Sequence, residues 1–172
     1  MAGKVPGSAT SAGATSDEAL LRQALAVAGR AREHGNHPFG AILVGPAGEV
    51  LLEQENGYLP AQDMTAHAER LLATRASQAY RPEFLASCAM FSSAEPCAMC
   101  AGAAYWSGIG RVVYGLSERR LREITGAHPE NPTLDLPCRA VFASGQRRVE
   151  VVGPLLEDEA AAVHAGAWER PP

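Results

Sequence analysis

Two short motifs constrain this chain more than any other feature: His67-Ala68-Glu69 and, further along, Pro96-Cys97-Ala98-Met99-Cys100. Cys97 and Cys100 are three residues apart, so their side chains share one face if this stretch is helical. Pro96 suits the first position of such a helix, because its missing N–H is not needed there. The positive end of the helix dipole then favours the thiolate of Cys97, which is the form that binds a metal. The spacing therefore predicts a pair of sulfur ligands at the start of a helix.

His67 offers a third ligand, and it stands shortly before the apolar pair Leu71 and Leu72, where a second helix is expected to begin. Zinc prefers a tetrahedral set of sulfur and imidazole ligands, and a catalytic site keeps one of the four positions for water. Three protein ligands thus predict one catalytic Zn2+ ion per subunit. Zinc lowers the pKa of bound water to about 7, which gives hydroxide near neutral pH. Glu69, beside the ligands, is the candidate proton carrier.

Other interpretations of the same residues remain open at this point. The cysteines can belong to a structural zinc knuckle, can be unrelated buried residues, or can serve redox chemistry. Cys88 and Cys138 can in principle complete a site with four ligands. However, Cys88 is expected to begin a buried strand, since free cysteine is often a core residue. Cys138 follows Pro137 in a segment without clear periodicity.

Length and composition limit the class of protein. A chain of 172 residues is expected to form one domain. The formal net charge of −4 argues against nucleic acid as the main partner, which usually leaves a basic footprint. Four cysteines without a secretory segment predict a cytoplasmic protein, and no apolar run has membrane length. Residues 1–16 are rich in Gly, Ala, Ser and Thr and are expected to be disordered, which leaves 17–172 as the domain.

Hydrophobic periodicity predicts alternating helices and strands, and hence a layered α/β domain. Thr15 and Glu18 fit a capping box at the start of the first helix. Residues 131–137 are interrupted by proline and are expected to form a loop. The expected helices are 17–33, 66–76, 97–107, 117–124 and 155–168, and the expected strands are 39–44, 49–56, 88–93, 111–114 and 149–152.

With these elements placed, the chain resembles the cytidine deaminase-like superfamily over roughly residues 20–152. The pattern H-x-E…P-C-x-x-C is the signature of zinc deaminases that act on nucleobases. The resemblance implies a three-layer α/β sandwich with a five-stranded mixed sheet between helices. It implies hydrolytic removal of an exocyclic amine, with zinc on His67, Cys97 and Cys100 and proton transfer by Glu69. It also implies a homodimer.

The small guanine deaminases and the tRNA adenosine deaminases are the branches that the chain resembles most. The segment Met64–Glu69 is similar to the P-T-A-H-A-E of both branches, with Met64 in place of proline. Asn56 stands where both carry a base-binding asparagine, whose amide offers a donor and an acceptor. In Asn56-Gly57 it can instead be a turn residue. The backbone N–H of Ala68 is a further contact to substrate in the family.

Aromatic residues favour the guanine deaminase branch. Phe39 lies in Pro38-Phe39-Gly40-Ala41 and Trp106 in Tyr105-Trp106, and both sequences resemble that branch. Each ring can form a wall of a base pocket or can simply pack in a core or on a helix. Trp168 resembles the aromatic residue that closes the active site in base deaminases, and it is equally compatible with the apolar face of a terminal helix.

Other features favour the tRNA branch, which Ala101–Ala103 and Ile109–Gly115 resemble. Guanine deaminases carry an acidic F-D-D stretch where this chain has Thr125–His128, so His128 or Glu130 would have to replace the acid or else lie in a solvated loop. A possible phosphate patch is better interpreted as a solvated face, because glutamates dilute its charge. Its residues are Arg119, Arg120 and Arg122, and Glu118 and Glu123 flank them.

The sequence therefore predicts a zinc hydrolase acting on a small-molecule nucleobase or related heterocycle. Guanine is the leading substrate, followed by cytosine, isoguanine and amino-triazines. A deaminase acting on the wobble adenosine of tRNA is the alternative and tRNA the less expected partner. A zinc-stabilised binding module without catalysis is the third hypothesis, and no membrane partner is expected.

Overall fold

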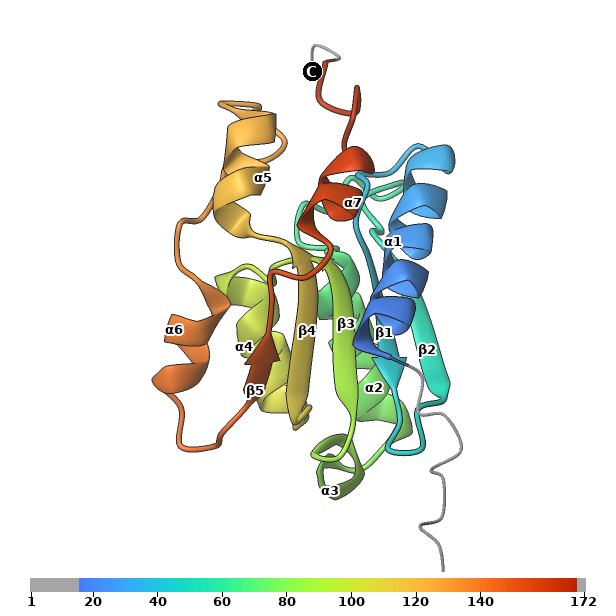
Figure 1. The fold of residues 1–172 in the computed structure, drawn as a ribbon, viewed down its shortest axis with the longest axis vertical. Helices are drawn as coiled ribbons and strands as arrows, with labels where there is room; N and C mark the ends of the chain where they lie inside the picture. The colour runs from blue at the N-terminus through green and yellow to red at the C-terminus, as the bar shows by residue number, and fades with distance from the viewer. Residues whose placement is uncertain (1–15, 170–172) are drawn as a thin grey trace, which may run out of the picture.

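A computed structural model of the chain describes residues 16–169 and has one mixed sheet between two layers of helices (Figure 1). The strand order is β2-β1-β3-β4-β5. Strand β1 runs antiparallel to both of its neighbours, whereas β3, β4 and β5 are parallel. The predicted five-stranded sheet is confirmed. The strands are β1 (Gly40–Val44), β2 (Val50–Glu55), β3 (Ala89–Ala94), β4 (Arg111–Leu116) and β5 (Glu150–Val152).

Helices cover both faces of the sheet, which confirms the three-layer sandwich (Figure 1). Helices α1 and α7 lie on one face, and α2, α4 and α6 lie on the other. No helix within residues 16–169 is long and apolar enough to span a membrane. The helices are α1 (Asp17–Glu33), α2 (Ala68–Ala79), α3 (Pro82–Leu85), α4 (Ala98–Ser107), α5 (Glu118–Thr125), α6 (Cys138–Ala143) and α7 (Glu157–Ala162).

The two cores follow from the alternation of side chains along each strand. In β1, Ala41 and Leu43 pack toward α2 and α4, while Ile42 and Val44 pack toward α1. All five residues of β1 are buried, because the strand lies inside the sheet and is covered on both faces. A continuous apolar run such as this one is typical of a strand covered on both sides.

Helix α1 spans Asp17–Glu33, which are the bounds predicted from the sequence. Ser16 is its N-cap, and the Ser16 hydroxyl accepts a hydrogen bond of 3.2 Å from the backbone N–H of Ala19. The predicted cap at Thr15 lies outside the described residues, as do residues 1–15 of the segment 1–16 that was predicted to be disordered. Ser16 itself belongs to the ordered domain.

The second half of the chain departs from the sequence prediction in two ways. Two short helices, α3 and α6, were not predicted. Helix α3 begins with Pro82 and α6 directly follows Pro137, and the fixed φ of proline favours the start of a helix. The last helix, expected over 155–168, ends at Ala162. Tight turns follow it, with Gly166 at a φ of +69°, and they fold Trp168 back toward the domain.

One edge of the sheet collects the segments that build the site. The carboxyl ends of the parallel strands β3 and β4 lie at this edge, and β3 leads directly into α4. Because β1 is antiparallel to β3, the start of β1 and the preceding Phe39 lie at the same edge. Ligands usually bind outside the carboxyl ends of strands in open α/β sheets.

Candidate active site

Three potential metal ligands meet at the starts of two helices. His67 is the N-cap of α2 and Cys97 the N-cap of α4, so Pro96 precedes the helix rather than opening it. Nδ1 of His67 lies 3.7 Å from Sγ of Cys97 and 3.6 Å from Sγ of Cys100. Ligands of a tetrahedral zinc, bound at about 2.0–2.3 Å, are about 3.5–3.8 Å apart. The three side chains therefore fit a zinc ion, and the predicted convergence of two helix starts is confirmed.

The two cysteines differ in electrostatic environment. The pKa of Cys97 is lowered to about 4, mainly by a hydrogen bond from the thiol of Cys100 and also by His67. A thiolate is thus favoured at this position, as metal binding requires. Cys88 and Cys138 do not belong to the group of ligands. Cys88 directly precedes β3, and its thiol donates to the carbonyl of Phe84 at 3.4 Å.

Glu69 follows His67 by two residues and is buried, yet it is not part of the ligand group. One of its carboxylate oxygens accepts a 2.8 Å hydrogen bond from the hydroxyl of Ser92 in β3. Burial raises the pKa of Glu69. Sequence reasoning did not identify Ser92, because only strand pairing brings it opposite α2.

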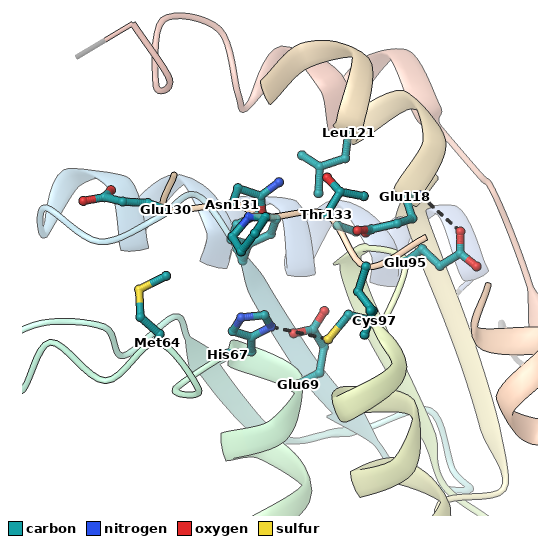
Figure 2. A pocket seen from close by; sticks show the side chains of 14 residues that line it. Met64, His67, Glu69, Glu95, Cys97, Glu118, Leu121, Glu130, Asn131 and Thr133 are labelled. Atoms are coloured by element: carbon teal, nitrogen blue, oxygen red, sulfur yellow. Dashed lines mark hydrogen bonds between the residues drawn. The ribbon is translucent and has the colours of Figure 1, made fainter. Parts of the chain in front are cut away.

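Two of the potential metal ligands, His67 and Cys97, line a cavity of about 230 Å³ (Figure 2). Apolar walls come from Phe39, ahead of β1, and Leu121, in α5. The segment between α5 and α6, residues 126–137, supplies a further wall through Glu130–Leu134. The cavity is lined by Phe39, Met64, His67, Glu69, Ala94, Glu95, Cys97, Glu118, Leu121, Glu130, Asn131, Pro132, Thr133 and Leu134.

The carboxylate of Glu95 accepts hydrogen bonds from the first residues of two helices, α5 and α6. Its Oε2 accepts the backbone N–H of Glu118 at 3.1 Å, and its Oε1 accepts the backbone N–H of Cys138 at 3.0 Å. These residues are the first of α5 and of α6, whose N–H groups have no partner within the helix. Glu95 therefore fixes the start of α5 and, through the start of α6, the far end of the 126–137 segment. Its position before Pro96 was visible in the sequence, but its two partners were not.

Glu118 was expected on the solvated face beside the arginines, and this prediction is wrong. It is the first residue of α5, it is only 9% exposed, and it lines the cavity. Burial, with a smaller contribution from Cys97, raises its pKa to about 7. The cause is the turn from β4 into α5, which directs the first side chain of the helix inward.

The predicted substrate contacts occupy different places. Phe39 lines the cavity, and Ala68 is buried as the first residue of α2. Asn56 is buried, and its Oδ1 accepts the backbone N–H of Tyr58 at 3.0 Å. It lines a neighbouring hollow rather than this cavity. Trp106 is 84% exposed on α4 and does not line the cavity.

Trp168 lies behind the cavity wall. Its ring stacks on that of His37, with 5.5 Å between centroids, and lies 6.1 Å from Phe39. Its indole N–H donates to Nδ1 of His164 at 3.2 Å. Since Phe39 itself lines the cavity, Trp168 supports that wall from the second layer.

The charged residues of α5 and of the following segment are mostly paired. Arg120 forms an ion pair with Asp158 at 2.7 Å, and Arg122 forms one with Asp135 at 3.2 Å. These pairs agree with the solvated face rather than with a phosphate patch. Glu130 lines the cavity but pairs with Nε2 of His37 at 2.9 Å.

Comparison with known proteins identifies the family. Residues 14–116 match the model of the cytidine and deoxycytidylate deaminase zinc-binding region. The chain belongs to this family. It is a zinc-dependent deaminase, with His67, Cys97 and Cys100 positioned to bind the ion.

Relatives of three kinds resemble the deaminase. A protein named as a probable cytosine deaminase of Schizosaccharomyces pombe is 40% identical over 89% of this chain and 93% of that relative. A guanine deaminase structure from Nitrosomonas europaea has a TM-score of 0.71 at 25% identity and covers 87% of this chain and 82% of its own. A tRNA-specific adenosine deaminase of Haemophilus influenzae is 36% identical, but over only 59% of each chain.

Proposed function

We propose that the enzyme hydrolytically deaminates a free nucleobase, with cytosine as the first candidate substrate and guanine as the second. The observation that carries this proposal is the size of the cavity beside His67 and Glu69, about 230 Å³. Pockets for drug-sized ligands measure roughly 300–1,000 Å³, so this cavity suits a single heterocycle better than a nucleotide. Water and the aminated base would give the corresponding carbonyl compound and ammonia.

The order of the two bases rests on the relatives. The relative named as a probable cytosine deaminase matches along almost the whole chain at 40% identity, which supports cytosine. The guanine deaminase structure supports guanine at 25% identity. The acid that the resemblance to guanine deaminases leads one to expect near Thr125–His128 is absent from the sequence, which also favours cytosine.

Each residue near the ligands has a chemical task in this proposal. Zinc held by His67, Cys97 and Cys100 would acidify a water molecule to a pKa of about 7. Glu69, with its pKa raised by burial, suits the transfer of a proton to the ring and to the departing amine. The hydrogen bond from Ser92 fixes the Glu69 carboxylate in place. Phe39 and Leu121 offer apolar surfaces to the faces of a planar ring.

Asn56 and Trp168 keep more distant roles in the proposal. Oδ1 of Asn56 accepts the N–H of Tyr58, and its amide nitrogen, which makes no hydrogen bond within residues 16–169, would be the group that donates to a base. Trp168 would hold Phe39 against the ring. Ala68 would offer its backbone N–H from the first turn of α2, where that group has no helical partner.

An assay of ammonia release tests the proposal. The purified zinc protein is incubated with cytosine, guanine, isoguanine, amino-triazines, cytidine and adenosine. Glu69→Gln should retain zinc and lose roughly 10²- to 10⁴-fold in rate, as expected for loss of a general acid–base group. Glu123→Gln, an exposed change on α5, serves as the control and should retain full activity.

Two results would refute this assignment. Failure of every free base to release ammonia would exclude it, and inosine formation in unmodified tRNA with a wobble adenosine would favour the RNA-editing alternative. Loss of zinc from Glu69→Gln would contradict the role given to that carboxylate.

We further propose a homodimer and a cytoplasmic location. Trp106 supports the dimer, because an apolar side chain 84% exposed on α4 would be covered by a second copy. The free state of Cys88, Cys97, Cys100 and Cys138 supports a reducing compartment.

A further inference from the structure

Glu118 is a buried acid whose side chain has no partner among the described residues. Its side chain makes no hydrogen bond or ion pair with any residue between 16 and 169, although the residue is only 9% exposed and lines the cavity. A carboxyl group that is largely removed from water and makes no hydrogen bond is costly, because little compensates for the water that it has lost. The group is therefore suited to receive an N–H from a molecule inside the cavity.

The other acids of the cavity are already engaged. Glu69 accepts from Ser92, Glu95 accepts two backbone N–H groups, and Glu130 pairs with His37. Among the described residues that line the cavity, Glu118 is thus the acid left for a ligand.

A second polar group, on a different segment, is also unsatisfied. The hydroxyl of Thr133 is buried and has no hydrogen-bond partner within the described part of the chain. Thr133 lines the same cavity as Glu118. Figure 2 shows both across the cavity from His67 and Glu69. A hydroxyl can donate and accept, so the pair offers two acceptors and one donor to the far edge of a bound ring.

We propose that Glu118 and Thr133 form a recognition subsite for the ring N–H that lies opposite the reacting carbon of the substrate. This inference rests on the proposed function and adds the feature that selects a free base over its nucleoside. Either protonation state of Glu118 leaves an oxygen that accepts the N–H.

The chemistry of the bases explains the selectivity. In cytosine the amine is on C4, and the N1–H lies directly across the ring. In guanine the amine is on C2, and the N–H of the five-membered ring lies at the far end. In a nucleoside this same nitrogen carries the sugar, so the hydrogen bond is lost and a bulky group meets the wall formed by Glu118 and Thr133.

The test compares each base with its N-methyl derivative. The values of kcat/KM are measured for cytosine and 1-methylcytosine, or for guanine and 9-methylguanine if guanine is the base turned over. The wild-type enzyme should prefer the unmethylated base. Glu118→Ala should lower kcat/KM for that base roughly 10- to 100-fold, as for a hydrogen bond to a charged group. The same substitution should change kcat/KM for the methylated base much less, because that base makes no hydrogen bond to Glu118 and the smaller alanine side chain leaves room for the methyl group.

Matched variants separate recognition from folding. Thr133→Val keeps the shape of the side chain and should reduce the preference by a smaller factor. Glu123→Ala, exposed on the same helix, should leave the preference unchanged. Zinc content is measured for every variant. Glu118→Met, which is similar in length but has no oxygen to accept the N–H, replaces Glu118→Ala if the latter loses zinc, and it should also reduce the preference.

The outcomes distinguish the two proposals. A wild-type enzyme that deaminates no free base refutes the proposed function and the subsite with it. An active wild-type enzyme whose preference survives in the Glu118 variant refutes the subsite alone. If the Glu118 variant retains zinc but loses the preference for the unmethylated base, the result supports the subsite.

Discussion

Replacement of Glu95 by alanine should destabilise the domain more than a change at most other charged positions. The Glu95 carboxylate is buried and accepts the backbone N–H groups of Glu118 and Cys138 at 3.1 Å and 3.0 Å. Alanine removes both acceptors at once. The first N–H groups of α5 and α6 are then left without a partner.

The magnitude follows from these two bonds. Leaving a buried donor unsatisfied costs about 1–3 kcal/mol, so the two together cost about 2–6 kcal/mol. For a domain of this size, 1 kcal/mol corresponds to about 2–4 °C in Tm. Glu95→Ala should therefore lower Tm by roughly 4–24 °C. Glu95→Gln keeps one acceptor but turns an NH2 group toward the second N–H, so it should produce a loss of similar or smaller size.

Thermal unfolding of the zinc-loaded protein, followed by circular dichroism, measures the effect. Glu123→Ala is the matched control, because it removes an exposed carboxylate from α5 without touching either bond. A Tm for Glu95→Ala within about 2 °C of the wild type, at equal zinc content, would show that the double cap does not stabilise the fold.

Two further predictions concern His164 and Trp106. Burial lowers the pKa of His164 from 6.5 to about 4, with a smaller effect of Arg32, so the unfolded chain protonates first as pH falls. The contribution of His164 to the free energy of unfolding should be fully present above pH 6.5 and should be lost toward pH 4, a loss of roughly 3 kcal/mol. Denaturant titrations should show that the free energy of unfolding of His164→Phe declines less over this pH range. Equal declines in the variant and the wild type would contradict this prediction. Trp106→Glu should shift the mass in sedimentation equilibrium from dimer to monomer, whereas an unchanged dimer would exclude this face as the interface.

Short-range sequence patterns predicted most of the architecture. Alternation and helical spacing depend on neighbours a few residues apart, so five strands and the helices from α1 to α5, except α3, were located to within about three residues. The two short helices after prolines, α3 and α6, lack a full period and were missed. The last helix was predicted too long, because alanine-rich periodicity does not reveal the turns after Ala162.

The metal ligands and the proposed proton carrier were also predicted from the sequence, because their spacing is local: Cys97 and Cys100 are three residues apart, and Glu69 follows His67 by two residues. What the sequence could not assign were side chains that meet across the fold. The turn from β4 into α5 directs Glu118 into the cavity, and the 126–137 segment brings Thr133 to it. Helix α4 turns Trp106 outward.

The amino-acid sequence by itself indicated the metal site and, through the family resemblance, the reaction, since the motif H-x-E…P-C-x-x-C lies in two short segments. Only the tertiary structure decided which polar groups meet at the cavity. Those contacts join β3, α5 and the segment before α6, and their distances depend on how the sheet orders its strands rather than on any local spacing.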